Sequence, residues 1–161
     1  MISYLTLILA FLLPQQVPSS SVARNQSRAA LTMLHASNPR VQWDAKSAVL
    51  ADITCDGITD IVVVGYDSES VWLALVPGLK SGQLAKPIIQ QFFVGAGAQS
   101  SICRKPVRIE VYPLDCEGDA GPLPGCKFVK GASEFGIYDD ACDHFEFYWD
   151  SERKALRWWR N

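Results

Sequence analysis

The residues of this chain best suited to chemistry lie in one acidic stretch, Ala51–Gly65. Oxygen-bearing side chains recur there at alternate positions, and the third is followed by Gly57, which tolerates the positive φ of a sharp turn. Such spacing lets a loop curl round a hard cation, and three carboxylates with neutral oxygens suit Ca²⁺. The predicted ligands are Asp52, Thr54, Asp56, the backbone carbonyl of Ile58, and Asp60. The alternative interpretation is an Asx-rich turn that binds no metal.

The residues around this loop distinguish it from an EF-hand. An EF-hand needs a bidentate Glu at the twelfth loop position, and counted from Asp52 that position is Val63. The flanking segments Ser47–Ala51 and Ile61–Val64 are typical of buried strands rather than helices. The expected motif is therefore a strand, an acidic loop and a second strand.

The pattern Asp-x-x-x-Asp-Gly-x-x-Asp-Ile-Val, which starts at Asp52, resembles the calcium loop of FG-GAP and VCBS-type repeats, best known from integrin-like β-propellers. The resemblance implies metal ligation by Asp52, Asp56 and Asp60. It also implies a ligand from the Ile58 carbonyl. The chain departs from the family at Thr54, where Asp or Asn is usual, so a hydroxyl replaces an anionic or amide ligand.

The start of the chain, Met1–Ala23, is typical of a secretory signal peptide. Its run Leu5–Leu13 is apolar apart from one Thr, precedes a stretch of small residues, and is too short to span a bilayer. The alternative is a buried N-terminal helix or strand. We therefore expect a periplasmic or secreted protein with a leader segment at 24–45, a single β domain at 46–161, and no membrane span in the mature chain.

The charge of the chain is nearly balanced, with 15 Lys and Arg against 17 Asp and Glu. No basic stripe indicates a nucleic-acid partner, and no polybasic patch indicates a membrane surface. We therefore expect neither kind of partner.

All five cysteines follow the predicted cleavage site, which in an exported protein indicates a disulfide framework with one thiol left over. Cys116 and Cys126 bracket a turn-rich loop, and Cys103 and Cys142 each stand just before a predicted strand. We predict the bridges Cys103–Cys142 and Cys116–Cys126, with Cys55 free, and spacing alone leaves other connectivities open. A zinc site is disfavoured because the chain has no Cys-x-x-Cys.

Apolar or alternating segments bounded by turn residues predict strands through most of the chain. These segments are Ser47–Ala51, Ile61–Tyr66, Val71–Val76, Ile88–Val94, Val107–Tyr112, Lys127–Val129 and Glu134–Tyr138. His144–Trp149 and Lys154–Arg160 predict a final aromatic hairpin. Only Asn25–His35 favours a short helix. We expect an all-β, mainly antiparallel fold, either a compact sandwich or a small barrel, because the chain is too short for a propeller.

The residues that could support catalysis are few. His144 has no nucleophile-elbow sequence beside it, and carboxylates near Cys55 would raise the pKa of its thiol. Three carboxylates before the last hairpin could form a pair for glycoside hydrolysis, but we interpret them as an exposed loop. They are Asp139, Asp140 and Asp143. The acidic excursion Pro113–Gly125 is likewise interpreted as a solvated loop rather than a second cation site. We therefore do not expect an enzyme.

These features together favour an exported, non-enzymatic binding protein in which Ca²⁺ stiffens a recognition surface. A small exported β domain with one FG-GAP-like loop loosely resembles bacterial periplasmic lysozyme-inhibitor and immunity proteins. That resemblance implies a protein partner such as a peptidoglycan hydrolase, and acidic loops would speed its encounter with a basic enzyme. The alternatives are a purely structural envelope protein and a calcium-dependent adhesion or carbohydrate-binding module. In the last, exposed Tyr148, Trp158 or Trp159 would stack on sugar rings.

Overall fold

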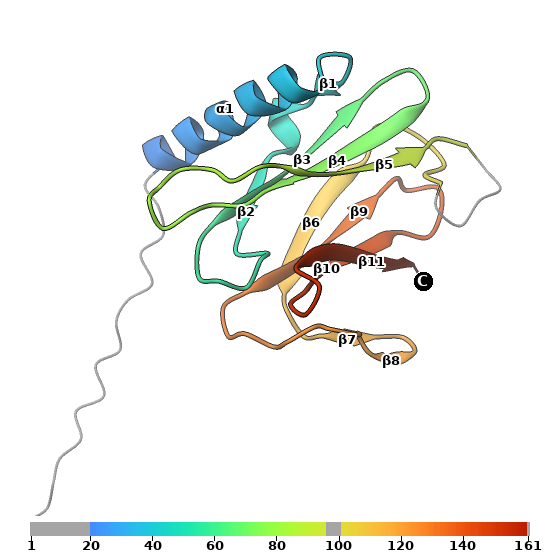
Figure 1. The fold of residues 1–161 in the computed structure, drawn as a ribbon. Coiled ribbons are helices and arrows are strands. Elements are labelled where there is room, and N and C mark those ends of the chain that lie inside the picture. The colour runs from blue at the N-terminus through green and yellow to red at the C-terminus, as the bar shows by residue number, and fades with distance from the viewer. Residues whose placement is uncertain (1–19, 96–100, 161) are drawn as a thin grey trace, which may run out of the picture.

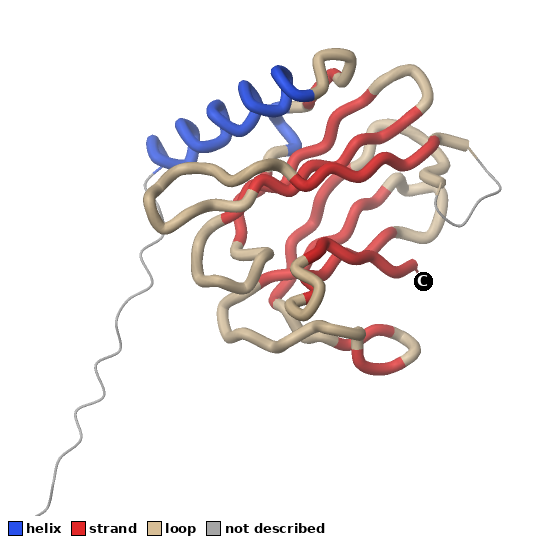
Figure 2. Tube along the Cα trace, in the orientation of Figure 1, coloured by secondary structure: helices blue, strands red, loops and turns tan. Residues whose placement is uncertain are grey.

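The computed structural model describes residues 20–95 and 101–160, and its main elements are two antiparallel β-sheets and one helix (Figure 1). The sheets face one another and the helix lies on the outside of one of them (Figure 2). The predicted fold class, all-β and mainly antiparallel, is confirmed, and of the two expected architectures, a sandwich or a small barrel, the sheets form the sandwich. The predicted signal peptide at Met1–Ala23 falls mainly outside the described residues.

The first sheet contains five strands, in which β1, β3, β4 and β5 follow one another and β2 pairs with β3. The strands are β1 (Gln42–Trp43), β2 (Val49–Ala51), β3 (Asp60–Tyr66), β4 (Ser70–Val76) and β5 (Ile88–Phe93). A 3₁₀ turn (Ala45–Ser47) between β1 and β2 is capped by the Asp44 carboxylate, which accepts the Lys46 N–H at 2.9 Å.

The second sheet contains four strands in the order β11-β10-β9-β6. The strands are β6 (Arg108–Pro113), β9 (Ser133–Tyr138), β10 (Phe145–Asp150) and β11 (Ala155–Arg160). Between β6 and β9 the chain makes an excursion that contains a small separate hairpin, β7 (Glu117–Gly118) and β8 (Gly121–Pro122).

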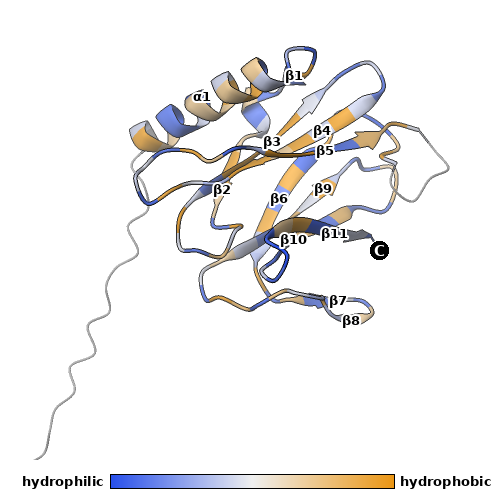
Figure 3. Cartoon of the chain, viewed as in Figure 1, coloured by the Kyte–Doolittle hydropathy of each residue, from blue (hydrophilic) through white to orange (hydrophobic). Residues whose placement is uncertain are grey.

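The central strands of the first sheet, β3 and β4, are buried on both faces. Helix α1 (Ser20–Ser37) packs Ala30 and Leu34 against one face, where Ile61 and Val63 of β3 are buried. The intervening residues of β3 and β4 point to the other face and form the core between the sheets. Both strands therefore read as unbroken apolar runs, which Figure 3 shows most clearly for β4.

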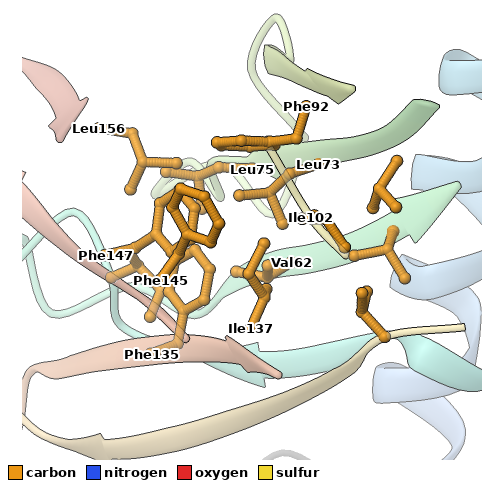
Figure 4. Packing of buried hydrophobic residues seen from close by; sticks show 14 residues of the cluster. Val62, Leu73, Leu75, Phe92, Ile102, Phe135, Ile137, Phe145, Phe147 and Leu156 are labelled. Carbon is orange, nitrogen blue, oxygen red and sulfur yellow. The ribbon is translucent and has the colours of Figure 1, made fainter. Parts of the chain in front are cut away.

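The core between the sheets is rich in aromatic rings that come from β5, β9 and β10 (Figure 4). Phe135 stacks on Phe147 with ring centroids 4.8 Å apart, and Phe92 meets Phe145 at 4.9 Å. Each strand of the second sheet contributes only alternate residues to this core. The strands β6, β9 and β10 therefore present a second, polar set of side chains on their outer face.

Three features of the N-terminal half and the excursion differ from the sequence prediction. The helix extends beyond Asn25–His35 at both ends, and at its C-terminal end the Asn38 N–H donates to the Leu34 carbonyl at 2.8 Å. The strand β1 was not expected. The strand predicted at Lys127–Val129 is wrong. That segment is irregular and Phe128 is 67% exposed. It belongs to the excursion between β6 and β9, and these two strands pair directly with one another.

None of the described helical residues forms a helix with the length and apolar character needed to cross a membrane.

Replacing Phe147 by Ala tests the aromatic core. The ring is fully buried against Phe135, so its removal should leave a cavity and lower the free energy of unfolding by about 3–5 kcal/mol. Phe93→Ala is the matched control, because Phe93 is 62% exposed and should change stability by no more than about 0.5 kcal/mol. Urea unfolding followed by fluorescence measures both, and equal losses would contradict this account of the core.

Candidate functional site

The predicted metal loop is held together by Asp60, whose side chain is fully buried at the start of β3. One oxygen of this carboxylate accepts the Ile53 and Thr54 N–H groups at 2.9 and 2.7 Å. The other accepts the Gly78 N–H at 3.0 Å, from the segment that follows β4. Burial raises the pKa of Asp60, and these N–H donors partly offset the effect. Asp60 thus ties the loop to its neighbour.

The two other carboxylates of the loop also accept backbone hydrogen bonds. Asp52 accepts the Asp56 N–H at 3.1 Å and the Gly57 N–H at 2.9 Å, and Asp56 accepts the Ile58 N–H at 2.9 Å. Gly57 has a φ of 80°, which is the conformation expected of the sharp turn. Burial raises the pKa of Asp52. The loop is therefore a series of Asx-type turns closed on their own backbone.

The donor types of this loop suit Ca²⁺. Among the described residues, however, no three His, Cys, Asp or Glu side chains are gathered as a metal-holding group. A carboxylate has about four lone-pair sites, and the three N–H bonds to Asp60 leave it little capacity. Thr54 Oγ1 is buried without a hydrogen bond of ordinary geometry, although it lies close enough to lower the pKa of Asp60. Asp52, Asp56 and Thr54 are thus the side chains with the most capacity left to bind a cation, and Asp60 has about one lone pair left.

Both disulfides join the cysteines that the sequence analysis paired. Cys103–Cys142 has a Cα–Cα distance of 6.0 Å, and Cys116–Cys126 has one of 5.6 Å. Cys55 is a free, half-buried thiol beside the acidic loop. Its burial, together with the nearby carboxylates, raises the pKa of Cys55 to about 11. It is therefore a poor nucleophile near neutral pH.

The three aspartates before the last hairpin do not form a catalytic pair. Asp139 is 7% exposed, and its carboxylate accepts the N–H groups of Ala141, Cys142 and Cys103. These hydrogen bonds fix the loop around the Cys103–Cys142 bridge and lower the pKa of Asp139 against the opposing effect of burial. Asp139 was therefore wrongly placed in an exposed loop, whereas Asp140 is exposed and pairs with Arg108.

The outer face of the second sheet gathers a set of polar residues that the sequence analysis did not single out. Cross-strand register places Glu110 of β6 and Glu146 of β10 on either side of Gly136 in β9. The same register places Tyr112 opposite Glu134. The only signal in the sequence was the alternation of polar with apolar residues in β6, β9 and β10.

Two tyrosines join these carboxylates into one network. The phenol oxygens of Tyr112 and Tyr138 are 2.7 Å apart, Tyr112 Oη lies 2.6 Å from Glu110 Oε2, and Tyr138 Oη lies 3.1 Å from Glu146 Oε1. The two tyrosine hydroxyls have one proton each, so they can donate only two full hydrogen bonds among these three contacts. His144 Nε2 lies 2.8 Å from the same Glu146 oxygen, and the His144 ring stacks on Tyr138 with centroids 4.5 Å apart. Burial and the neighbouring Glu110 raise the pKa of Tyr112.

Gly136 makes this network possible. A Cβ atom at this position would lie 2.7 Å from Tyr138 Cε2 and 3.1 Å from Glu146 Oε1. The absence of a side chain lets the Tyr138 ring lean across its own strand and reach Glu146. Any other residue would force the ring and the carboxylate apart.

Beside this network the outer face is hollowed into a recess of about 590 Å³. One wall is the sheet itself, and the other is the start of the excursion, which the Cys116–Cys126 bridge closes. The lining residues are Tyr112, Pro113, Leu114, Asp115, Glu117, Glu134, Tyr138, Glu146 and Trp159. The recess therefore combines four carboxylates with three aromatic rings.

Glu134 lies at the centre of the electrostatics of this recess. Burial raises the pKa of Glu134 to about 7, and the charges of Asp115 and Glu146 add to the effect. A hydrogen bond from the Asp115 backbone opposes it. The recess thus concentrates negative charge that its own side chains do not neutralise.

The aromatic residues proposed to stack on sugars are placed differently from one another. Tyr148 is 4% exposed and donates its hydroxyl to the Pro124 carbonyl at 3.2 Å. Trp158 packs edge-on against Phe92 and Phe145, with centroids 6.0 and 5.1 Å away. Of the three, Trp159 alone lines the recess.

Comparison of the chain with protein-family models, with curated proteins and with solved structures finds no match.

The raised pKa of Glu134 predicts a pH-dependent stability. Its pKa of about 7 in the folded state exceeds its ordinary value of 4.5, so folding binds a proton. The associated stability is complete below about pH 4.5 and is lost as the pH rises through about 7. As the pH rises between these two values, the free energy of unfolding of Glu134→Gln should therefore increase relative to that of the wild type. Above about pH 7 the difference between the two proteins should stay constant.

Urea unfolding of the wild type, Glu134→Gln and Glu117→Gln across this pH range measures the effect. Glu117 lines the same recess but is exposed, so it controls for the loss of one charge. Parallel profiles for the wild type and Glu134→Gln would show that the pKa of Glu134 is not raised.

Proposed function

We propose that this chain is an exported, non-enzymatic binding protein that inhibits a peptidoglycan hydrolase and is stabilised by Ca²⁺. The observation that carries the proposal is the outer face of the second sheet. It is a rigid sheet surface with an acidic, aromatic recess, and none of the described residues lining that recess is Lys or Arg. Such a surface complements a basic protein.

Two features of the chain support export. Two disulfides, Cys103–Cys142 and Cys116–Cys126, are typical of proteins from oxidising compartments. The apolar start of the chain has the pattern of a signal peptide. A periplasmic or secreted inhibitor would meet cell-wall hydrolases in that compartment.

The chemistry of the candidate groups favours binding over catalysis. The Cys55 thiol has a pKa of about 11, and His144 Nε2 is already engaged by Glu146. The tyrosines and carboxylates of the outer face are largely hydrogen-bonded to one another. Groups fixed in this way form a preorganised contact surface.

Calcium would act on this surface through the acidic loop. The Asp52 carbonyl accepts the Ser133 N–H at 2.8 Å, and Ser133 opens the strand that carries Glu134. The ligands that we propose are Asp52, Thr54, Asp56, the Ile58 carbonyl and Asp60. A cation bound by them would stiffen the loop and thereby the end of β9 beside the recess.

Thermal unfolding with EGTA and then with millimolar Ca²⁺ tests the metal. Binding to the folded state alone should raise stability by about 2.7 kcal/mol at a hundredfold excess over Kd, with a higher midpoint. Asp56→Ala should abolish the rise, because Asp56 is exposed and can be replaced without opening the core. Asp119→Ala, an exposed carboxylate of the excursion, should keep it. If Ca²⁺ does not raise the stability of the wild type, or raises that of Asp56→Ala equally, the loop is an Asx-rich turn that binds no metal.

Capture from a bacterial envelope extract tests the partner. The immobilised, oxidised protein should retain a peptidoglycan hydrolase, release it as salt rises, and slow wall lysis by that enzyme. Retention of wall polysaccharide without a hydrolase would favour the carbohydrate-binding alternative, for which Trp159 in the recess is the supporting observation. A hydrolase that is neither captured nor inhibited would overturn the proposal.

A further inference from the structure

We propose that the recess on the outer face of the second sheet receives an arginine side chain from the protein partner, with the guanidinium held between carboxylates and aromatic rings. The inference rests on the proposed function for the existence of a protein partner. The binding of an arginine side chain is argued from the residues of the recess alone. The residues that would make the contact are Tyr112, Asp115, Glu134, Glu146 and Trp159.

The same sheet face already binds one guanidinium of its own. Arg108 lies over the Tyr138 ring at 4.8 Å from its centroid. It also pairs with Glu110 at 2.7 Å and with Asp140. A ring and two carboxylates thus satisfy a guanidinium at one end of the network. At the other end of the network, around Tyr112 and Glu134, the recess also places aromatic rings beside carboxylates. None of the described residues that line the recess is Lys or Arg.

The negative charge of the recess favours the binding of a cation. Glu134 is half-buried near Asp115 and Glu146. Burial, together with repulsion from these two carboxylates, raises the pKa of Glu134 to about 7. His144 pairs with Glu146 from the side of Tyr138, and Arg157 lies opposite Tyr148 rather than in the lining. A bound cation would relieve the repulsion that the protein itself leaves in place.

The form of the recess favours arginine over lysine. A guanidinium is planar, donates hydrogen bonds in several directions within one plane, and stacks on aromatic faces. The lining offers Tyr112, Tyr138 and Trp159 beside several carboxylates, which matches both properties. A lysine ammonium is a more strongly hydrated point charge and gains less from the rings.

A second hollow adjoins the recess and suggests what flanks the arginine. It shares Tyr112, Pro113 and Leu114 with the recess and is also lined by Phe128 and Val111. Phe128 is 67% exposed and Val111 is 37% exposed. Exposed apolar side chains beside a charged pocket are typical of protein interfaces, in which arginine and aromatic residues dominate the binding energy. The partner segment should therefore carry an apolar residue next to its arginine.

Titration of the ¹⁵N-labelled protein with three short peptides tests the inference by NMR. The probes are acetyl-Phe-Arg-Gly-amide, the same peptide with Lys, and the same peptide with neutral citrulline. The arginine peptide should shift the Trp159 indole and Gly136 amide signals and bind about tenfold more tightly than citrulline. Glu134→Gln should lose that preference, whereas Glu152→Gln, an exposed carboxylate on the β10–β11 turn, should keep it.

Three results would overturn the inference. They are equal shifts with all three peptides, an arginine preference that survives Glu134→Gln, and displacement of the arginine peptide from Trp159 by a chitin oligosaccharide with tighter binding. Hydrolase capture separates this inference from the proposed function. A hydrolase retained equally by wild type and Glu134→Gln would leave the function standing and remove the arginine site. If the recess binds the arginine peptide selectively but no hydrolase is captured, the arginine site stands and the proposed function is wrong.

Discussion

Burial of β3 and β4 on both of their faces is the constraint on which the rest of the molecule depends. Helix α1 covers one face of β3 and β4 and the second sheet covers the other. Apolar residues therefore occupy every position from Ile61 to Val64 in β3 and from Val71 to Val76 in β4. Polar chemistry has no room there. The two polar sites described above lie at the ends of these strands, where the acidic loop is, and on the outer face of the second sheet.

The second sheet is buried on one face only, so its other face is available for polar side chains. Its strands give one residue in two to the core, as Phe135 and Ile137 do in β9, and leave the intervening residues to interact with one another. Gly136 is the position that lets them do so, because Tyr138 and Glu146 occupy the space that a side chain would fill. The Cys116–Cys126 bridge then holds the excursion beside this face and gives the recess its second wall.

The sequence predicted features that depend on local pattern and missed those that depend on register. Most strands and the class of fold follow from periodicity, and the loop-closing pair Cys116–Cys126 follows from short separation. The network of Glu110, Tyr112 and Tyr138 was not predictable in this way. It requires β6 to pair with β9 across the excursion, and each of its residues taken alone looks like an ordinary solvated strand position.

The acidic loop and the recess are physically continuous, although the sequence separates them widely. Asp60 accepts N–H groups from both the loop and Gly78, and the Asp52 carbonyl accepts the N–H of Ser133, next to Glu134. One backbone hydrogen bond and one residue of β9 thus connect the loop to Glu134 of the recess. If the loop binds Ca²⁺, the cation would stabilise a segment next to Glu134 although none of the loop residues lines the recess. A metal with a structural role would then change affinity, because a less mobile recess loses less conformational entropy when a side chain enters it.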